Sequence, residues 1–432
     1  MLRRLTGFTL LPLLSLVTPF LLLPVVARVA GAAGWSSVVA GQAVGTFGAT
    51  VTFWGWNVVG PVAVARATDA GARTALYAAS LRTRLLLLLP VVPVAALVTT
   101  VVAQPGYRLV GASMAVATSL LGLSPAWFGI GVGQPWLLFW YDTLPRVAAA
   151  VLAVPLVLLT RAVWTYPVIL VVATLLGLVA FQRRHAPGAD WSPLPLHRPV
   201  GELREQGGTA GVNLVATAYA STPAPIATSS FPGVVASGLS SADAVYRLGL
   251  FSVVAVGNAF QGWTLEPGLP HARDRVRRHR AALAAHTGLG LAGAVFLVGF
   301  GPVVTRVLFG DAVAASREVC AGYAVSFLLI STSTPFVRNL LIPAGRTRLV
   351  LLWTAASAVV GVGVMVGAAV ADWLAGVAWG MAASEAALLF GLAGPAWREL
   401  RSSSPATVRV REGENPPSRG RREPPSAPRG TA

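Results

Sequence analysis

The sequence lacks lysine altogether and carries little charge of either sign. All 33 basic residues are arginine, only 16 residues are acidic, and charged residues make up 11% of the chain. A soluble domain carries about 25% charged residues, so this composition excludes an ordinary soluble protein. Hydrophobic residues make up 55% of the chain, and its mean hydropathy is +0.67. We therefore expect a membrane protein.

Cysteine is almost absent. Cys320 stands alone, which excludes an intramolecular disulfide, a CxxC redox motif and a thiolate metal site. The histidines form no H-x-x-x-H or H-E-x-x-H pair, so no metal centre is expected. We expect all of them in or beside cytoplasmic loops: His185, His197, His271, His279 and His286. No cofactor is expected either.

Arginines gather in every second gap between long apolar stretches. These gaps lie at Arg3-Arg4, 66–84, Arg146, 183–204, 273–280, 338–348 and from Arg398 onward. Arginine bias in short loops sets which side of a bilayer a loop occupies, so these gaps and both termini are predicted to be cytoplasmic. The predicted location is the inner (cytoplasmic) membrane. A sequence pI near 11.5 could suggest nucleic acid, but the arginines lack the interleaved aromatics of such a surface, and no nucleic-acid partner is expected.

Apolar stretches long enough to cross a bilayer recur along the chain. They predict an all-α polytopic membrane protein with about twelve spans, grouped in two pseudo-symmetric six-helix bundles. The predicted spans are 6–27, 36–64, 85–103, 109–130, 146–160, 163–182, 209–237, 242–268, 283–305, 317–337, 349–370 and 374–396.

A proline-rich polar segment divides the apolar chain into halves. We predict an N-terminal lobe (1–182), a cytoplasmic linker (183–207), a C-terminal lobe (208–396) and a disordered cytoplasmic tail (397–432), since the tail has too few apolar residues to fold. The pair Gly55-Trp56 recurs as Gly262-Trp263, each followed by Ala-Arg at the same separation. An even number of spans in each half predicts lobes related by an axis along the membrane normal.

Charged residues inside the spans are the first candidates for function, because a charge in a span is costly unless it faces protein or water. Arg28 is expected at the outer end of the first span, and Asp243 and Arg247 one turn apart in the eighth. Two alternatives stay open. Arg28 could extend to the membrane surface, and Arg247 could serve only as the ion-pair partner of Asp243.

Neutral polar residues fall in the corresponding spans. Gln42, Asn57 and Asn258 are predicted, with Arg28, Asp243 and Arg247, to bind substrate in a cavity between the lobes. Guanidinium groups hold phosphate in bidentate fashion, so such a cavity suits an anion. The alternative for the amides is hydrogen bonding between helices.

Short motifs along the chain resemble those of a known family. Residues 19–31, from Pro19-Phe20 to Arg28-Val29-Ala30-Gly31, resemble the P-[YF]-…-R-x-x-G end of helix one in Wzx-like polysaccharide flippases. These belong to the multidrug/oligosaccharidyl-lipid/polysaccharide export (MOP) superfamily. Further similar segments are Gly41-Gln42-Ala43, Trp54-Gly55-Trp56, 124–131 (SPAWFGIG), 242–247 (ADAVYR) and Glu266-Pro267. The resemblance covers about residues 5–396, with arginine or nothing where many relatives carry lysine.

The resemblance implies a flippase and not an enzyme. It would move undecaprenyl-diphosphate-linked oligosaccharide across the membrane by alternating access, coupled to a proton or sodium gradient through Glu266 or Glu385. Implied partners are this lipid-linked oligosaccharide, membrane lipids and a polysaccharide polymerase or glycosyltransferases. Two alternatives share the fold: a peptidoglycan lipid-precursor flippase and a small-molecule or drug antiporter. A membrane-embedded transferase would need larger outer loops than the sequence has.

Overall fold

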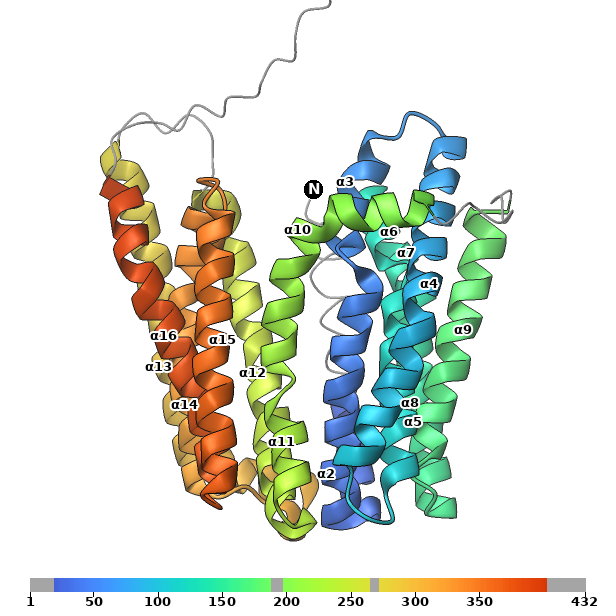
Figure 1. Cartoon of the computed structure of the whole chain (residues 1–432), viewed down its shortest axis with the longest axis vertical. Coiled ribbons are helices and arrows are strands. Elements are labelled where there is room, and N and C mark those ends of the chain that lie inside the picture. Colours follow the sequence, from blue (N-terminus) through green and yellow to red (C-terminus); the bar gives the residue numbers. More distant parts are fainter. Residues whose placement is uncertain (1–18, 188–196, 265–271, 402–432) are drawn as a thin grey trace, which may run out of the picture.

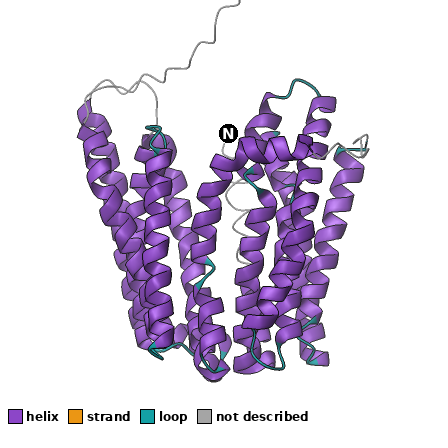
Figure 2. Cartoon of the chain, viewed as in Figure 1, coloured by secondary structure: helices purple, strands orange, loops and turns teal. Residues whose placement is uncertain are grey.

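The computed structural model describes residues 19–187, 197–264 and 272–401, and all regular structure in these ranges is helical (Figure 2). The first part holds α2 (Pro19–Phe53), α3 (Trp56–Arg66), α4 (Ala70–Val102), α5 (Arg108–Leu120), η1 (Leu121–Leu123), α6 (Ala126–Gly131), α7 (Pro135–Leu138), η2 (Phe139–Thr143), α8 (Leu144–Thr160) and α9 (Thr165–His185). The second holds α10 (His197–Ala220), α11 (Pro223–Ser230), α12 (Gly233–Thr264), α13 (Ala272–Phe309), η3 (Asp311–Val313), α14 (Arg317–Pro335), η4 (Phe336–Leu341), α15 (Thr347–Val370) and α16 (Leu374–Arg401).

The helices form two groups that lie side by side (Figure 1). One group contains α2 to α9 and the other α12 to α16, with α10 and α11 running between them. Helices α2 and α12 are in contact across the boundary, and α10 touches both α2 and α15. This arrangement agrees with a division into two halves, while the exact boundaries and the predicted rotation between the halves stay predictions.

The predicted multi-pass, all-α membrane fold is confirmed. Within the described ranges, 10 helices are long and apolar enough to cross a membrane. One candidate, Leu22–Arg66, is 45 residues long and contains the end of the first predicted span and all of the second. The seventh predicted span, 209–237, is divided among α10, α11 and the start of α12, so it is not one continuous helix. The outward sides of the helices carry large apolar residues that suit contact with lipid, among them Leu89, Val101, Leu159, Val359 and Val370.

A break in the helical backbone at Gly31 separates the first predicted span from the second. Gly31 has φ 65° and ψ −176°, and a positive φ strongly favours glycine. A second break, at Trp54 (φ 42°) and Gly55 (φ 85°), separates α2 from α3. Small residues then bring α2 close to α5: a Cβ added at Gly45 would lie 2.4 Å from the Ala115 carbonyl oxygen, closer than atoms can approach. Such close backbone approach is a common way to pack helices in membranes.

The two ends of the bundle differ in their arginines. We call the lower end in Figure 1, with the α4–α5, α11–α12 and α13–α14 connections, the Gly31 face, because Ala33 lies against Gly233 there. The opposite end, with the α3–α4 and α14–α15 connections, is the Arg66 face. Arginines at helix ends gather at the Arg66 face, including Arg66, Arg73, Arg183, Arg184, Arg277, Arg346, Arg348 and Arg398. The Gly31 face has Arg28, Arg108, Arg161, Arg306 and Arg317. By the positive-inside rule, this excess of arginine favours a cytoplasmic location for the Arg66 face.

Several segments differ from the sequence-based expectation. Most of the gap predicted at 66–84 belongs to helix α4, in which Arg84 is fully buried. Helix α10 begins at His197, inside the stretch 183–207 expected to be an irregular linker, and its first part crosses the Arg66 face in Figure 1. The Trp54 indole Nε1 donates to the Leu203 carbonyl there (2.8 Å), which ties this helix to α2. Arg146, expected at the cytoplasmic start of the predicted span 146–160, lies in α8, well inside the candidate membrane helix Pro135–Thr160. Apolar residues before it, in α7 and η2, extend the membrane helix toward the Arg66 face.

Candidate substrate cavity

A cavity of about 450 Å³ lies between the two groups of helices. Helix α2 contributes a stripe of its lining, α5, η1 and α8 add to the same side, and α12 forms the opposite wall. Its lining residues are Leu23, Trp35, Val39, Gln42, Ala43, Thr46, Thr118, Leu121, Arg146, Asp243, Ala244, Arg247, Leu250, Phe251 and Val254. Most of them are apolar, and the two cations come from opposite walls. This size and composition are typical of a ligand-binding cavity.

Arg247 presents a guanidinium to the cavity from α12. Its Nε donates to Asp243 Oδ2 (2.6 Å), and its Nη2 donates to the Ala220 carbonyl at the end of α10 (2.6 Å). The Arg247 side chain is 34% accessible, whereas Asp243 is only 2% accessible. The Asp243 carboxylate is thus covered by Arg247. A ligand in the cavity therefore contacts the Arg247 guanidinium.

Arg146 presents the second guanidinium from α8. Its Nη2 lies 2.6 Å from Asp142 Oδ1, again with an i, i+4 spacing. The same Asp142 oxygen accepts from the Ser124 hydroxyl (2.5 Å). The carbonyl of Ser124 in turn accepts from Arg84 Nη1 (2.9 Å). This chain of bonds links a cavity arginine to Arg84, which is fully buried in the first group of helices.

The cavity is closed on the Gly31 face by contacts between the two groups of helices. The Trp35 indole of α2 stacks on Phe309 of α13 with ring centroids 5.1 Å apart. Gln104 Nε2, between α4 and α5, donates to the carbonyls of Thr228 (2.5 Å) and Phe231 (2.9 Å). We call this set of contacts the Gly31 seam. Toward the Arg66 face the ribbons of the two groups diverge (Figure 1).

Arg28 lies outside the lining of the cavity. It is an exposed residue on the Gly31 face, and its Nη2 donates to the Val307 carbonyl of α13 (2.7 Å). The contact spans the two groups of helices, so Arg28 is part of the Gly31 seam. A role of Arg28 in substrate binding stays a prediction.

The other predicted site residues are scattered. Gln42 and Asp243 line the cavity with Arg247. Asn57 is exposed on α3, and Asn258 is exposed on α12, where its Oδ1 accepts from Arg338 Nη2 (2.8 Å). Glu385 is buried in α16, near enough to Tyr219 and Tyr246 to interact electrostatically, and its Oε2 has no partner in the described part of the chain. Glu266 lies outside the described residues.

Sequence analysis missed two groups. Arg146 is the first residue of the predicted span 146–160 and was not among the predicted site residues, although the D-x-x-x-R spacing of Asp142 and Arg146 repeats that of Asp243 and Arg247. His286 was expected beside a loop, yet it is fully buried in α13 against α14, where its carbonyl accepts from the Ser331 hydroxyl (2.6 Å). His286 falls inside the predicted span 283–305, but hydropathy does not show whether it faces protein or lipid.

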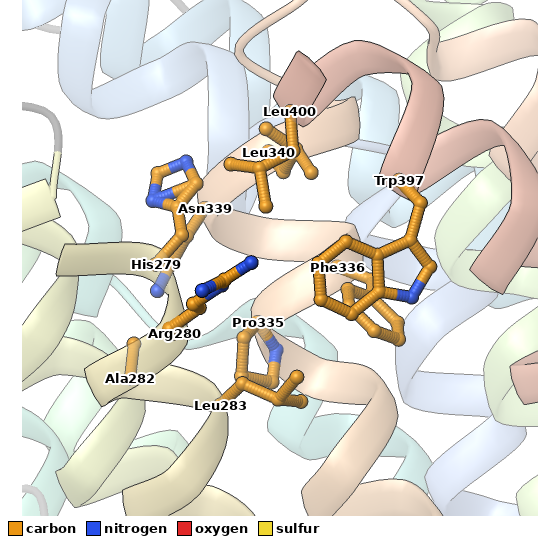
Figure 3. A pocket seen from close by; sticks show the side chains of 10 residues that line it. All are labelled: His279, Arg280, Ala282, Leu283, Pro335, Phe336, Asn339, Leu340, Trp397 and Leu400. Atoms are coloured by element: carbon orange, nitrogen blue, oxygen red, sulfur yellow. The ribbon is translucent and has the colours of Figure 1, made fainter. Parts of the chain in front are cut away.

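A second pocket lies within the group α12 to α16, near the Arg66 face (Figure 3). Its volume is about 20 Å³, and its walls come from α13, the end of α14, η4 and α16. The space suits about one water molecule and is too small for a substrate. The figure shows Arg280 and His279 on one side of it and the rings of Phe336 and Trp397 on the other.

Comparisons with known proteins identify the fold. No family model matches the sequence, and no curated protein matches it. The chain is similar to a solved structure described as a lipid II flippase MurJ in an inward closed conformation, with TM-score 0.70, 10% identity and coverage of 91% of this chain and 87% of that one. It is also similar to an inward-facing multidrug resistance MATE family transporter of the MOP superfamily, with TM-score 0.61, 15% identity and coverage of 91% and 96%. The eukaryotic MATE transporter AtDTX14 gives TM-score 0.50 and 12% identity, with coverage of 93% and 97%.

The chain has the fold of these transporters. The similarity extends over 91% to 93% of this chain. At these identities the comparison concerns the fold, and the substrate has to be inferred from the residues of this chain.

Proposed function

We propose that this protein is a transporter that moves an anionic, lipid-linked saccharide across the membrane. The polysaccharide precursor that the sequence resemblance implies, an undecaprenyl-diphosphate-linked oligosaccharide, is the proposed substrate. The observation that carries the proposal is that Arg146 and Arg247 face one cavity from opposite walls. Guanidinium groups suit the phosphate oxygens of such a head group.

The shape of the protein supports alternating access. The Gly31 seam closes one side of the cavity, and both Trp35 and Arg28 make contacts across it. Opening of this seam and closure of the opposite side would expose the same arginines to the other side of the membrane. The Arg66 face is proposed to be cytoplasmic, in the inner membrane, as its arginines favour. A substrate would then enter from the cytoplasmic side.

The coupling ion is a further part of the proposal. Glu385 is a buried carboxyl in α16, in the second group of helices. A carboxyl in this environment can exchange a proton or hold a sodium ion as the two groups move. We propose Glu385 for this role, together with Glu266, and expect an imposed proton or sodium gradient to accelerate transport.

Two alternatives rest on the comparisons. The similarity to a lipid II flippase favours a peptidoglycan lipid precursor, which is also a polyprenyl diphosphate. The similarity to a multidrug transporter favours a small molecule. Cationic drugs fit poorly, because Asp243, the acid that lines the cavity, lies behind Arg247 and is 2% accessible. A polysaccharide polymerase or glycosyltransferases would be functional partners only for the first substrate.

Reconstitution tests the proposal directly. The purified protein is placed in liposomes with a polyprenyl diphosphate that carries a fluorescent oligosaccharide, and a membrane-impermeant quencher reports the fraction in the outer leaflet. We expect the quenched fraction to rise above that of protein-free liposomes. A polyprenol that carries the same oligosaccharide without the diphosphate is the matched substrate control. Equal transport of both lipids, or of neither, would contradict a diphosphate-specific flippase.

A further inference from the structure

Arg338 is a third arginine near the cavity, and its side-chain partners differ from those of the two cavity arginines. It lies in η4, a π-helical segment after Pro335, and π-helical turns are frequent at functional sites. Its Nη2 donates to Asn258 Oδ1 (2.8 Å) and to Gln261 Oε1 (3.2 Å) on α12. Arg146 and Arg247 each have an aspartate partner. Within the described residues the printed side-chain partners of Arg338 are these two neutral amides, and it makes no ion pair there.

The three residues continue the cavity wall of α12. Cavity-lining positions on this helix are 243, 244, 247, 250, 251 and 254. Steps of three or four residues keep to one side of a helix, so Asn258 and Gln261 follow Val254 on the same side. At 1.5 Å per residue, Asn258 is about 16 Å beyond Arg247 along α12, toward the Arg66 face. The cluster therefore lies at the mouth of the cavity, on the side away from the Gly31 seam.

The hydrogen bonds give this cluster a definite chemical character. Both amide oxygens accept from the guanidinium, which leaves the amide nitrogens of Asn258 and Gln261 as donors. A guanidinium has five N–H donors, and both bonds to the amides use Nη2. The cluster thus offers donors and a positive charge, which suits an anion and not a cation. Gly257 makes room for it, because a Cβ there would lie 3.0 Å from Arg338 Nη1.

We propose that Arg338, Asn258 and Gln261 form an anion-binding subsite that takes the diphosphate of the substrate before it reaches Arg247. The inference rests on the proposed function, since it assigns the first contact of the same lipid-linked substrate. The head group would pass from Arg338, held by neutral amides at the mouth, to Arg247, paired with Asp243 in the cavity. A phosphate ester could also come from an anionic membrane lipid, and the test separates the two sources.

Binding of farnesyl diphosphate, a soluble isoprenoid diphosphate, tests the subsite. The protein is placed in phosphatidylcholine nanodiscs, and binding is measured by calorimetry, with farnesol as the probe without an anion. Arg338→Gln should weaken binding of the diphosphate about tenfold or more, because charge-assisted hydrogen bonds are lost. Asn258→Asp keeps the guanidinium of Arg338 but places a carboxylate beside it. This variant should weaken diphosphate binding similarly, since the carboxylate would neutralise Arg338. Arg346→Gln removes the same charge from an exposed position at the Arg66 face and should change nothing.

The outcomes distinguish the subsite from the proposed function. Wild-type affinity in both Arg338→Gln and Asn258→Asp, with transport by the wild-type protein intact, would overturn the subsite alone. Failure of the wild-type protein to bind farnesyl diphosphate and to transport would overturn both proposals. A second set of nanodiscs contains phosphatidylglycerol. If the difference between the wild-type protein and Arg338→Gln disappears there, lipid headgroups occupy the cluster and its role as a substrate subsite is wrong.

Discussion

The indole Nε1 of Trp35 on α2 donates a hydrogen bond of 3.0 Å to the hydroxyl of Ser241 on α12. The two residues are 206 positions apart in the chain and belong to different groups of helices. Both are fully buried. This bond lies where the cavity ends and the Gly31 seam begins, since Trp35 also lines the cavity.

The Trp35–Ser241 bond should contribute measurably to the stability of the closed seam. Trp35→Phe and Ser241→Ala each remove one partner, and the double variant removes both. We expect a coupling free energy of about 1 kcal/mol, the usual net contribution of such a bond. Thermal unfolding of the four proteins in detergent measures it. Strictly additive losses would show that the two residues do not interact.

The seam also depends on the absence of a side chain at Gly233. A Cβ there would lie 2.6 Å from Ala33 Cα, so Gly233→Ala should hold the two groups of helices apart on the Gly31 face. We expect a loss of about 1–3 kcal/mol of stability, typical of an overpacked contact, and slower transport. Gly288→Ala is the matched control, because a Cβ at Gly288 meets no atom within 4 Å. Equal unfolding midpoints in the two variants would show that the seam tolerates the added methyl group.

The two faces should be accessible from opposite sides of the membrane. In a Cys320→Ser background, Ala70→Cys places a thiol on the Arg66 face and Asp311→Cys places one on the Gly31 face; both positions are exposed. A membrane-impermeant maleimide added to intact cells should label position 311 and reach position 70 only after permeabilisation, because the arginine-rich face is retained in the cytoplasm. Labelling of position 70 in intact cells would reverse the proposed orientation.

The role of Arg247 in binding can be separated from its role in the fold. Arg247→Gln leaves Asp243 buried without its partner, which should destabilise the protein by about 3–5 kcal/mol. The pair Asp243→Asn with Arg247→Gln removes both charges and should restore much of that stability, yet transport should be lost. Arg306→Gln with Asp311→Asn deletes an exposed pair and serves as control. Full transport by the Asp243→Asn and Arg247→Gln double variant would mean that the ion pair is only structural.

Arg84 should hold the broken segment between α5 and α6 in place. Its guanidinium donates to the carbonyls of Gly122 (3.2 Å) and Ser124 (2.9 Å), and it lies over the Trp127 ring at 5.8 Å. Arg84→Met leaves these carbonyls without their donor and should cost about 2 kcal/mol or more of stability. The loss should be larger than that of Arg66→Gln, an exposed arginine of the same half. Similar unfolding midpoints for the two variants would contradict this role.

The sequence alone determined the class of protein and much of its helix pattern. Long apolar runs and scarce charge predict a multi-pass helical bundle, since only such segments satisfy their backbone in lipid. The motif that ends at Gly31 correctly separates two predicted spans, and the pair Gly55-Trp56 lies at the α2–α3 break. These features are local, so they could be predicted without knowledge of the neighbouring helices.

The tertiary structure decided which polar residues share a cavity. Arg28 and Arg146 are both arginines near predicted span ends, yet one contacts Val307 on the Gly31 face and the other lines the cavity. The π-helical turn η2 precedes α8 and changes the side toward which later residues point, which hydropathy does not reveal. Likewise, Asn258 contacts Arg338, 80 positions away in the chain, because α12 packs against η4. Hydropathy and charge fix which segments enter the bilayer, whereas the direction of a side chain inside it depends on the helices packed around it.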